Sequence, residues 1–152
     1  ADAMRLDWGA LLGAGSPGWV LVANLPYNVA TPLVADLLGG VPAIERMLVM
    51  VQREVGERLA AKVGDEAYGA VSVKVAYWAT AAVVGLVPAS VFVPRPNVES
   101  ALVRIDRRDP PATDRALLFG LVRTAFGQRG SVAQAIAHES PGWRLYDPGQ
   151  EG

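Results

Sequence analysis

Short apolar runs, separated by glycine-rich or polar turns, divide the first part of the chain into alternating strands and helices. Residues 19–23 and 47–51 are continuous apolar runs, which are typical of strands buried on both faces. Thr31 is expected to cap a helix that has Pro32 at its first position. The predicted helices span residues 6–12, 33–38, 54–63 and 68–78. This alternation predicts right-handed βαβ units in a parallel sheet.

The pattern changes after residue 78. Residues 81–86 and 101–105 resemble strands, and the proline-rich segment 87–97 that joins them has no room for a long helix. Such a short connection predicts an antiparallel pair at the edge of the sheet. Residues 109–113 are predicted to form a linker, and the spacing of apolar residues over 114–128 predicts an amphipathic helix.

Composition limits the classes of function. The chain has 152 residues, of which 51% are hydrophobic and 19% charged, so it can bury the core of about one domain. It has no cysteine, which excludes disulfides and thiolate metal sites. Its single histidine, His138, lies in a polar segment and is interpreted as a solvated surface residue, so no metal site is expected.

Charge and hydropathy add weaker indications. No apolar run approaches the roughly 18 residues that span a bilayer, and the start of the chain does not resemble a signal peptide. A cytoplasmic protein with no membrane association is therefore expected. A net charge of −1 argues mildly against nucleic-acid binding. Six arginines in the later part of the chain could still form a local basic face: Arg104, Arg107, Arg108, Arg115, Arg123 and Arg129.

The candidate chemistry lies in Asn24, Leu25, Pro26 and Tyr27, directly after a predicted buried strand. Ligands of open α/β sheets bind at the carboxyl ends of strands. The Asn24 amide oxygen and the Leu25 carbonyl could accept both hydrogens of an exocyclic amine such as adenine N6, and so stabilise the positive charge that develops during methylation. Tyr27 offers a ring on which an unstacked base could lie. Taken by themselves, these four residues favour an ordinary turn.

A longer pattern favours the catalytic interpretation. Residues 24–33, with 50–55, 68–73 and 91–101, resemble the motifs of the ribosomal RNA small-subunit adenine-N6 dimethyltransferase family in order and spacing. The resemblance covers roughly residues 2–128. It implies the later half of a Rossmann-like, S-adenosylmethionine-dependent methyltransferase fold, with a mixed sheet and an antiparallel edge strand. It also implies dimethylation of adenine in small-subunit ribosomal RNA, with the precursor of the small ribosomal subunit as partner, by a monomeric enzyme.

The resemblance also implies roles for individual residues. Asp2 and Ala3 would bind the adenine end of S-adenosylmethionine, and Asn24 would serve both cofactor and substrate. Phe92 would stack on the target base opposite Tyr27. From the residues alone, Asp2 is interpreted as a solvated carboxylate near the terminus, and Phe92 could equally be a core aromatic.

Two further functions stay open at this stage. One is methylation of adenine in large-subunit ribosomal RNA, and the other is a non-catalytic RNA-binding role in ribosome assembly. The sequence lacks the family's glycine-rich cofactor loop, so it is expected to be a fragment that is inactive by itself. The predicted divisions are a partial catalytic domain at residues 1–108, a linker and helix at 109–130, and a disordered tail at 131–152.

Overall fold

The computed structural model describes residues 2–13, 18–111 and 114–127. The chain divides into two compact units, residues 1–111 and 112–152. In the second unit, α5 (Arg115–Gly127) confirms the predicted amphipathic helix to within one residue at each end. The expected tail, with His138, lies outside the described residues, and the predicted domain limits stay a prediction. None of the helices in the described ranges combines the length and apolar character needed to cross a bilayer.

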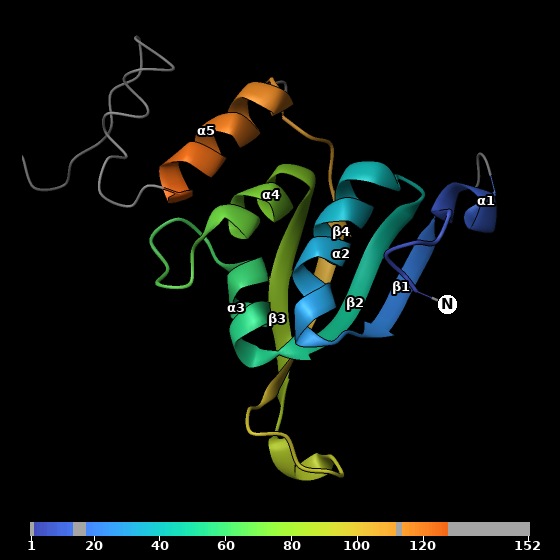
Figure 1. Ribbon diagram of the computed structural model, residues 1–152, viewed down its shortest axis with the longest axis vertical. Coiled ribbons are helices and arrows are strands. Elements are labelled where there is room, and N and C mark those ends of the chain that lie inside the picture. The colour runs from blue at the N-terminus through green and yellow to red at the C-terminus, as the bar shows by residue number, and fades with distance from the viewer. Residues whose placement is uncertain (1, 14–17, 112–113, 128–152) are drawn as a thin grey trace, which may run out of the picture. The chain divides into compact units, whose positions relative to one another are not determined.

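The first unit is a mixed sheet with helices (Figure 1). The sheet has the order β1-β2-β4-β3, in which β1 and β2 are parallel and β4 runs antiparallel to both of its neighbours. The antiparallel pairing of β3 with β4 at the sheet edge confirms the prediction for that region. The helices and strands of the first unit are, in chain order, α1 (Trp8–Leu12), β1 (Trp19–Asn24), α2 (Tyr27–Gly40), β2 (Ile44–Gln52), α3 (Arg53–Ala60), α4 (Ala70–Trp78), β3 (Ala79–Val87), the short 3-10 helix η1 (Ala89–Val91) and β4 (Ser100–Arg107).

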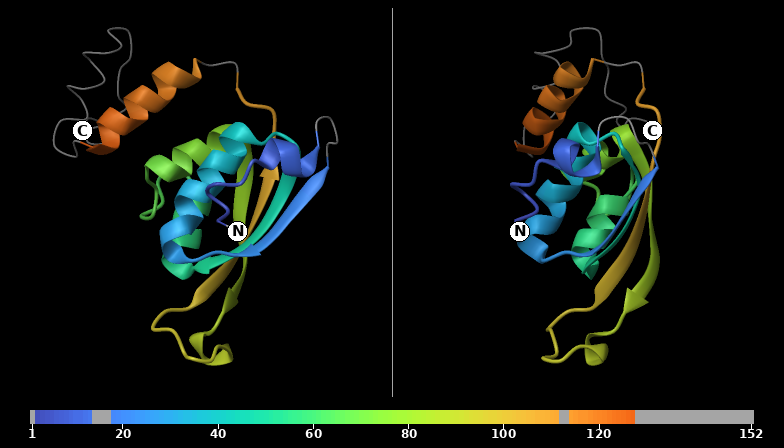
Figure 2. Two further views of the ribbon diagram at one scale, coloured as in Figure 1. Left: turned by 45° about the vertical axis from the view of Figure 1, so that its right-hand side comes forward. Right: turned by 90° about the vertical axis from the view of Figure 1, so that its right-hand side faces the viewer.

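Helices α2, α3 and α4 cover one face of the sheet (Figure 2). The core lies between them, and its fully buried side chains alternate along β2 and β4: Met47, Val49, Val51, Ala101, Val103 and Ile105. Helix α3 approaches the sheet closely at Gly56. A Cβ atom there would lie 2.9 Å from the Ala101 Cβ and 3.0 Å from Val103 Cγ2. Glycine at this position therefore sets the distance between α3 and β4.

The start of α2 corrects the prediction that Thr31 caps this helix. The helix begins at Tyr27, with Pro26 as its N-cap, and Pro32 lies inside it. The backbone N–H groups of Val29 and Ala30 donate to the Pro26 carbonyl, at 3.1 and 3.0 Å. Burial explains why the helix continues through Pro32, because its buried positions have helical spacing on both sides of that residue: Ala30, Leu33, Val34, Leu37 and Leu38. Tertiary packing outweighs the proline signal here.

The exposure of β1 corrects a second prediction, that this strand is buried on both faces. Val20 is 54% exposed and Val22 is 71% exposed. Strand β1 is an edge strand of the described sheet, and none of the described helices of the first unit covers the face to which these two valines point (Figure 2). The apolar run correctly predicted a strand, whereas the burial of its second face depends on a covering layer.

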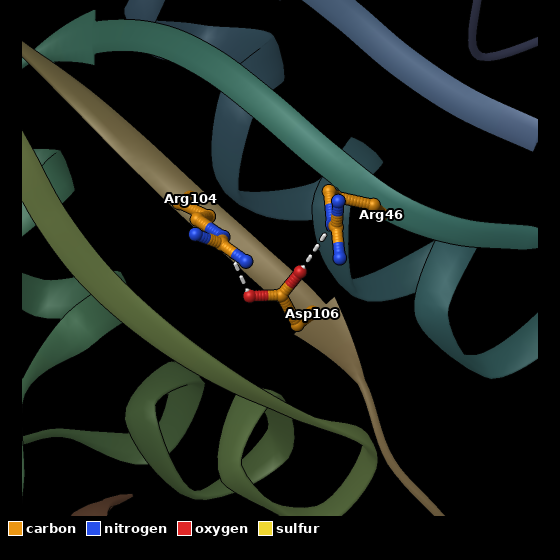
Figure 3. Close-up of polar contacts among 3 residues, drawn as sticks. All are labelled: Arg46, Arg104 and Asp106. Atoms are coloured by element: carbon orange, nitrogen blue, oxygen red, sulfur yellow. Dashed lines mark hydrogen bonds and ion pairs between the residues drawn. The ribbon is translucent and has the colours of Figure 1, made fainter.

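Charged side chains occupy one end of this uncovered face (Figure 3). Asp106 of β4 accepts a hydrogen bond from Arg46 Nε at 2.6 Å and another from Arg104 Nε at 2.8 Å. Partial burial raises the pKa of the Asp106 carboxyl, but the two arginines together outweigh this effect and hold the pKa below its ordinary value. On the other side of the sheet, along α3, Arg58 Nη2 lies 3.1 Å from Glu54 Oε1, at the four-residue spacing typical of helical ion pairs.

Candidate active site

The sheet topology brings the predicted site and the proline-rich loop to one edge. Strands β1, β2 and β3 end there, at Asn24, Gln52 and Val87, and the register places Ser100 of β4 opposite both Gln52 and Val87. The starts of α2 and α3 and the loop 88–99 lie at this same end (Figure 1). This is the carboxyl edge at which open α/β sheets bind ligands.

The backbone around Pro26 separates the end of β1 from the start of α2. The Leu25 N–H donates to the Met50 carbonyl at 2.9 Å, which extends the pairing of β1 with β2 by one residue. Pro26 then adopts φ −61° and ψ 149°. The Pro26 carbonyl accepts hydrogen bonds from the first turn of α2. The preceding carbonyl, that of Leu25, lies at the end of the strand and outside the hydrogen bonding of the helix.

Two hydrogen-bond acceptors are therefore adjacent at this edge. The Asn24 side chain is exposed. Among the residues that the structure describes, neither the Asn24 amide nor the Leu25 carbonyl has a hydrogen-bond partner. An amide oxygen and a carbonyl side by side are suited to accept from one amino group. The prediction that both serve the reaction stays untested, and this geometry is compatible with it.

The two predicted stacking residues lie on different elements. Tyr27 is the first residue of α2, and its side chain is 66% exposed. Phe92 follows η1 in the loop 88–99 and is half-buried. No direct ring contact between them is found within the described ranges. The predicted base sandwich therefore requires a ligand between the two rings and stays a prediction.

The predicted cofactor residues near the start of the chain make local contacts. Asp2 Oδ1 accepts from the Met4 N–H at 3.0 Å, and Asp2 Oδ2 lies 3.6 Å from Arg5 Nε. Ala3 packs against the core, and its carbonyl accepts from Trp8 Nε1 at 3.3 Å. The structure does not place Asp2 in hydrogen-bond contact with Asn24. Their joint role in cofactor binding stays a prediction.

A cluster that the sequence did not single out lies at the same edge. Arg53 Nε donates to Glu57 Oε1 at 2.8 Å, and Arg53 Nη1 donates to Glu99 Oε2 at 2.9 Å. The pKa of Arg53 is raised, first by its hydrogen bond to Glu57 and then by that to Glu99. The four-residue spacing of Arg53 and Glu57 could have indicated the first contact. Glu99 is distant in sequence, and no local pattern points to it.

Beside this cluster is a hollow of about 330 Å³, lined by Gln52, Arg53, Glu54, Glu57, Val98 and Glu99. It holds three carboxylates and one guanidinium. Such a lining disfavours a phosphate group, because the negative charges outnumber the positive one. The hollow is therefore a poor place for the backbone of a nucleic acid.

Comparison with known proteins decides the family. A model of the family described as ribosomal RNA adenine dimethylase matches residues 15–142. The chain belongs to this family. The Ribosomal RNA small subunit methyltransferase A of Acidothermus cellulolyticus is 54% identical over 112 residues, which cover 72% of this chain and 39% of that protein. The protein of the same name from Thermobifida fusca is 51% identical over 117 residues, covering 76% and 41%.

Solved structures show the fold of the dimethylase family. A dimethyladenosine transferase from Plasmodium falciparum has a TM-score of 0.66 at 26% identity, covering 85% of this chain and 51% of that one. The 23S rRNA methyltransferase ErmE has the same TM-score at 23% identity, which supports the fold alone. The expected Rossmann-like methyltransferase fold is thereby confirmed. The chain spans less than half the length of the two curated relatives named above.

Proposed function

We propose that the protein containing this sequence transfers methyl groups from S-adenosylmethionine to adenine N6 in small-subunit ribosomal RNA, with dimethyladenine as product. The observation that carries the proposal is the pair of adjacent acceptors, Asn24 and Leu25, at the carboxyl end of β1. Membership of the dimethylase family and the names of the curated relatives support the substrate. The partner would be a precursor of the small ribosomal subunit.

The residues of this chain fit one end of the cofactor. Asn24 presents an exposed amide without a partner in the described chain, and Ala3 provides a small apolar side chain against the core. Asp2 is exposed, so its local contacts with Met4 and Arg5 can be exchanged for a ligand amino group at small cost. When bound, S-adenosylmethionine supplies a methyl group made electrophilic by positively charged sulfur.

The contribution of Asn24 and Leu25 is electrostatic. The lone pair of adenine N6 is delocalised into the ring, so this nitrogen is a weak nucleophile. Two acceptors facing its two hydrogens favour the pyramidal, positively charged nitrogen that forms during attack. Both groups are held on the backbone between β1 and α2, so little reorganisation is needed. No strong base is required before attack.

The base would have to leave its stack to reach this edge. Tyr27 exposes two thirds of its surface, which leaves its ring free to receive an unstacked adenine. Phe92, on the loop 88–99, would close over the opposite face of the base. Stacking on an aromatic ring contributes about 1–3 kcal/mol per base, enough to offset much of the cost of unstacking.

The test is single-turnover methylation by the full-length protein that contains this sequence, with labelled S-adenosylmethionine and immature small ribosomal subunits. Asn24→Ala should lower the rate of the chemical step by about 10²–10³ while RNA affinity is kept. Label should appear in N6-dimethyladenine of the small-subunit RNA. An Asn24→Ala variant that loses RNA affinity but keeps its rate would contradict the assigned role. RNA binding with no methylation by the unaltered full-length protein would favour a role in ribosome assembly.

A further inference from the structure

Arg53 connects the start of α3 to the loop that carries Phe92. Its guanidinium donates to the Glu99 carboxylate at 2.9 Å, and its backbone N–H donates to the Glu99 carbonyl, also at 2.9 Å. A second nitrogen of the same guanidinium donates to Glu57, one turn along α3. Glu57 thus binds one side of the guanidinium, and Arg53 independently holds Glu99 at two points, through its side chain and its backbone.

Glu99 is the last residue of the loop 88–99. Beyond it, Ser100 begins β4 and pairs with both Val87 and Gln52. The remainder of the loop has little burial to hold it, since Val91 is 61% exposed and Val93 is 98% exposed. A polar tether at the base therefore has a large share in fixing where the loop points.

A different role for Arg53 would be direct contact with an RNA phosphate. Its surroundings argue against this role, because both hydrogen-bonding edges of the guanidinium are engaged by carboxylates and Glu54 lines the same hollow. A phosphate would have to compete with two charged acceptors that are already in place.

We propose that Arg53 is a positioning residue that holds the loop 88–99 through Glu99 and thereby places Phe92 over the target base. The placement of a base rests on the proposed function, whereas the tether itself does not. Arg53 lies outside the pair of acceptors, so it acts on the reaction only through the loop.

The tether is tested by hydrogen exchange at the Val91 and Phe92 amides, which donate to Pro88 and Ala89 within the loop. In the full chain, Arg53→Met and Glu99→Ala should each speed this exchange about two- to fivefold, the range expected for losing a half-exposed ion pair. Glu57→Ala is the matched control. It removes the other carboxylate but leaves the Glu99 bridge, so loop exchange should stay within about 1.5-fold of the unaltered chain.

Reversing the two charges gives a second test of the tether. In the Glu57→Ala background, Arg53→Glu combined with Glu99→Arg should return the hydrogen-exchange rate of the loop to that of Glu57→Ala alone. The tether would be overturned if Arg53→Met left the hydrogen-exchange rate of the loop unchanged. It would also be overturned if the charge-reversed pair failed to restore slow hydrogen exchange.

A second measurement on the full-length protein separates positioning from phosphate contact. For Arg53→Met, a positioning role predicts a lower methylation rate and an unchanged dependence of RNA affinity on salt. A phosphate contact predicts a salt slope reduced by about 0.7–0.9, and this result would overturn the proposal. If the unaltered protein methylates no RNA, the proposed function fails, and the exchange data still decide the tether.

Discussion

Arg107 is expected to hold the end of α2 to the sheet, and Arg107→Met tests this directly. Its guanidinium donates to four backbone carbonyls: Leu38 and Ile44 at 2.8 Å, Val41 at 3.0 Å and Leu37 at 3.2 Å. The last carbonyls of a helix have no partner within the helix. Arg107 supplies such partners from β4, on the face that α2 covers. Methionine keeps the apolar stem and removes every donor.

The size of the effect follows from burial and from the number of bonds. The Arg107 side chain is half-buried, and desolvation lowers the pKa of its guanidinium without making it neutral at ordinary pH. A hydrogen bond to a charged group contributes about 1.5–3 kcal/mol, but several bonds from one group do not add, and water can replace some of them. A loss of about 2–4 kcal/mol in the free energy of unfolding is expected.

Chemical and thermal unfolding of the full chain provide the assay. At about 4 °C per kcal/mol for a domain of this size, Arg107→Met should lower Tm by about 8–16 °C. Arg104→Met is the matched control, since it removes an arginine from the same strand. Within the described part of the chain, Arg104 pairs with Asp106 alone, and that pair is exposed to solvent. That control should cost at most about 1 kcal/mol. If the two variants unfold alike, the reasoning about the end of α2 is wrong.

Three further predictions concern packing, pH and the loop. Gly56→Ala should cost about 1–3 kcal/mol because its Cβ would overlap Ala101, whereas Gly40→Ala, with open space around it, should be neutral or slightly stabilising in urea unfolding. Asp106→Asn should remove a contribution of the Asp106 carboxylate to the free energy of unfolding. The pKa of this carboxyl is lower in the folded than in the unfolded state, so its contribution is complete above the unfolded pKa of about 4 and is lost as pH falls below that value. The stability difference between the two proteins should therefore shrink from pH 6 to pH 3, and a constant difference would contradict this. Phe92→Leu should weaken the RNA-dependent step with Tm unchanged if the ring stacks on a base, and a lower Tm with unchanged kinetics would instead make it a core residue.

The candidate site was accessible from sequence because its chemistry is local. Asn24, Leu25 and Pro26 are consecutive, and the apolar run before them indicated the strand that ends there. A proline that fixes the backbone after a strand acts in the same way wherever the strand lies. The Arg53–Glu99 contact was not accessible, since 46 residues separate its members. Only the pairing of β2 with β4 brings Gln52 opposite Ser100 and places the two charges side by side.

The sequence by itself determined where strands and helices occur, because apolar spacing reflects which side chains a single element can bury. It also determined the antiparallel pairing of β3 with β4, since the proline-rich segment between them is too short for a helical crossover. The tertiary structure decided the start of α2, where burial of Ala30 and Leu33 carries the helix through Pro32. It also decided the exposure of Val20 and Val22. Burial on the second face of a strand is a property of whichever layer packs against it, and no pattern within the strand specifies that layer.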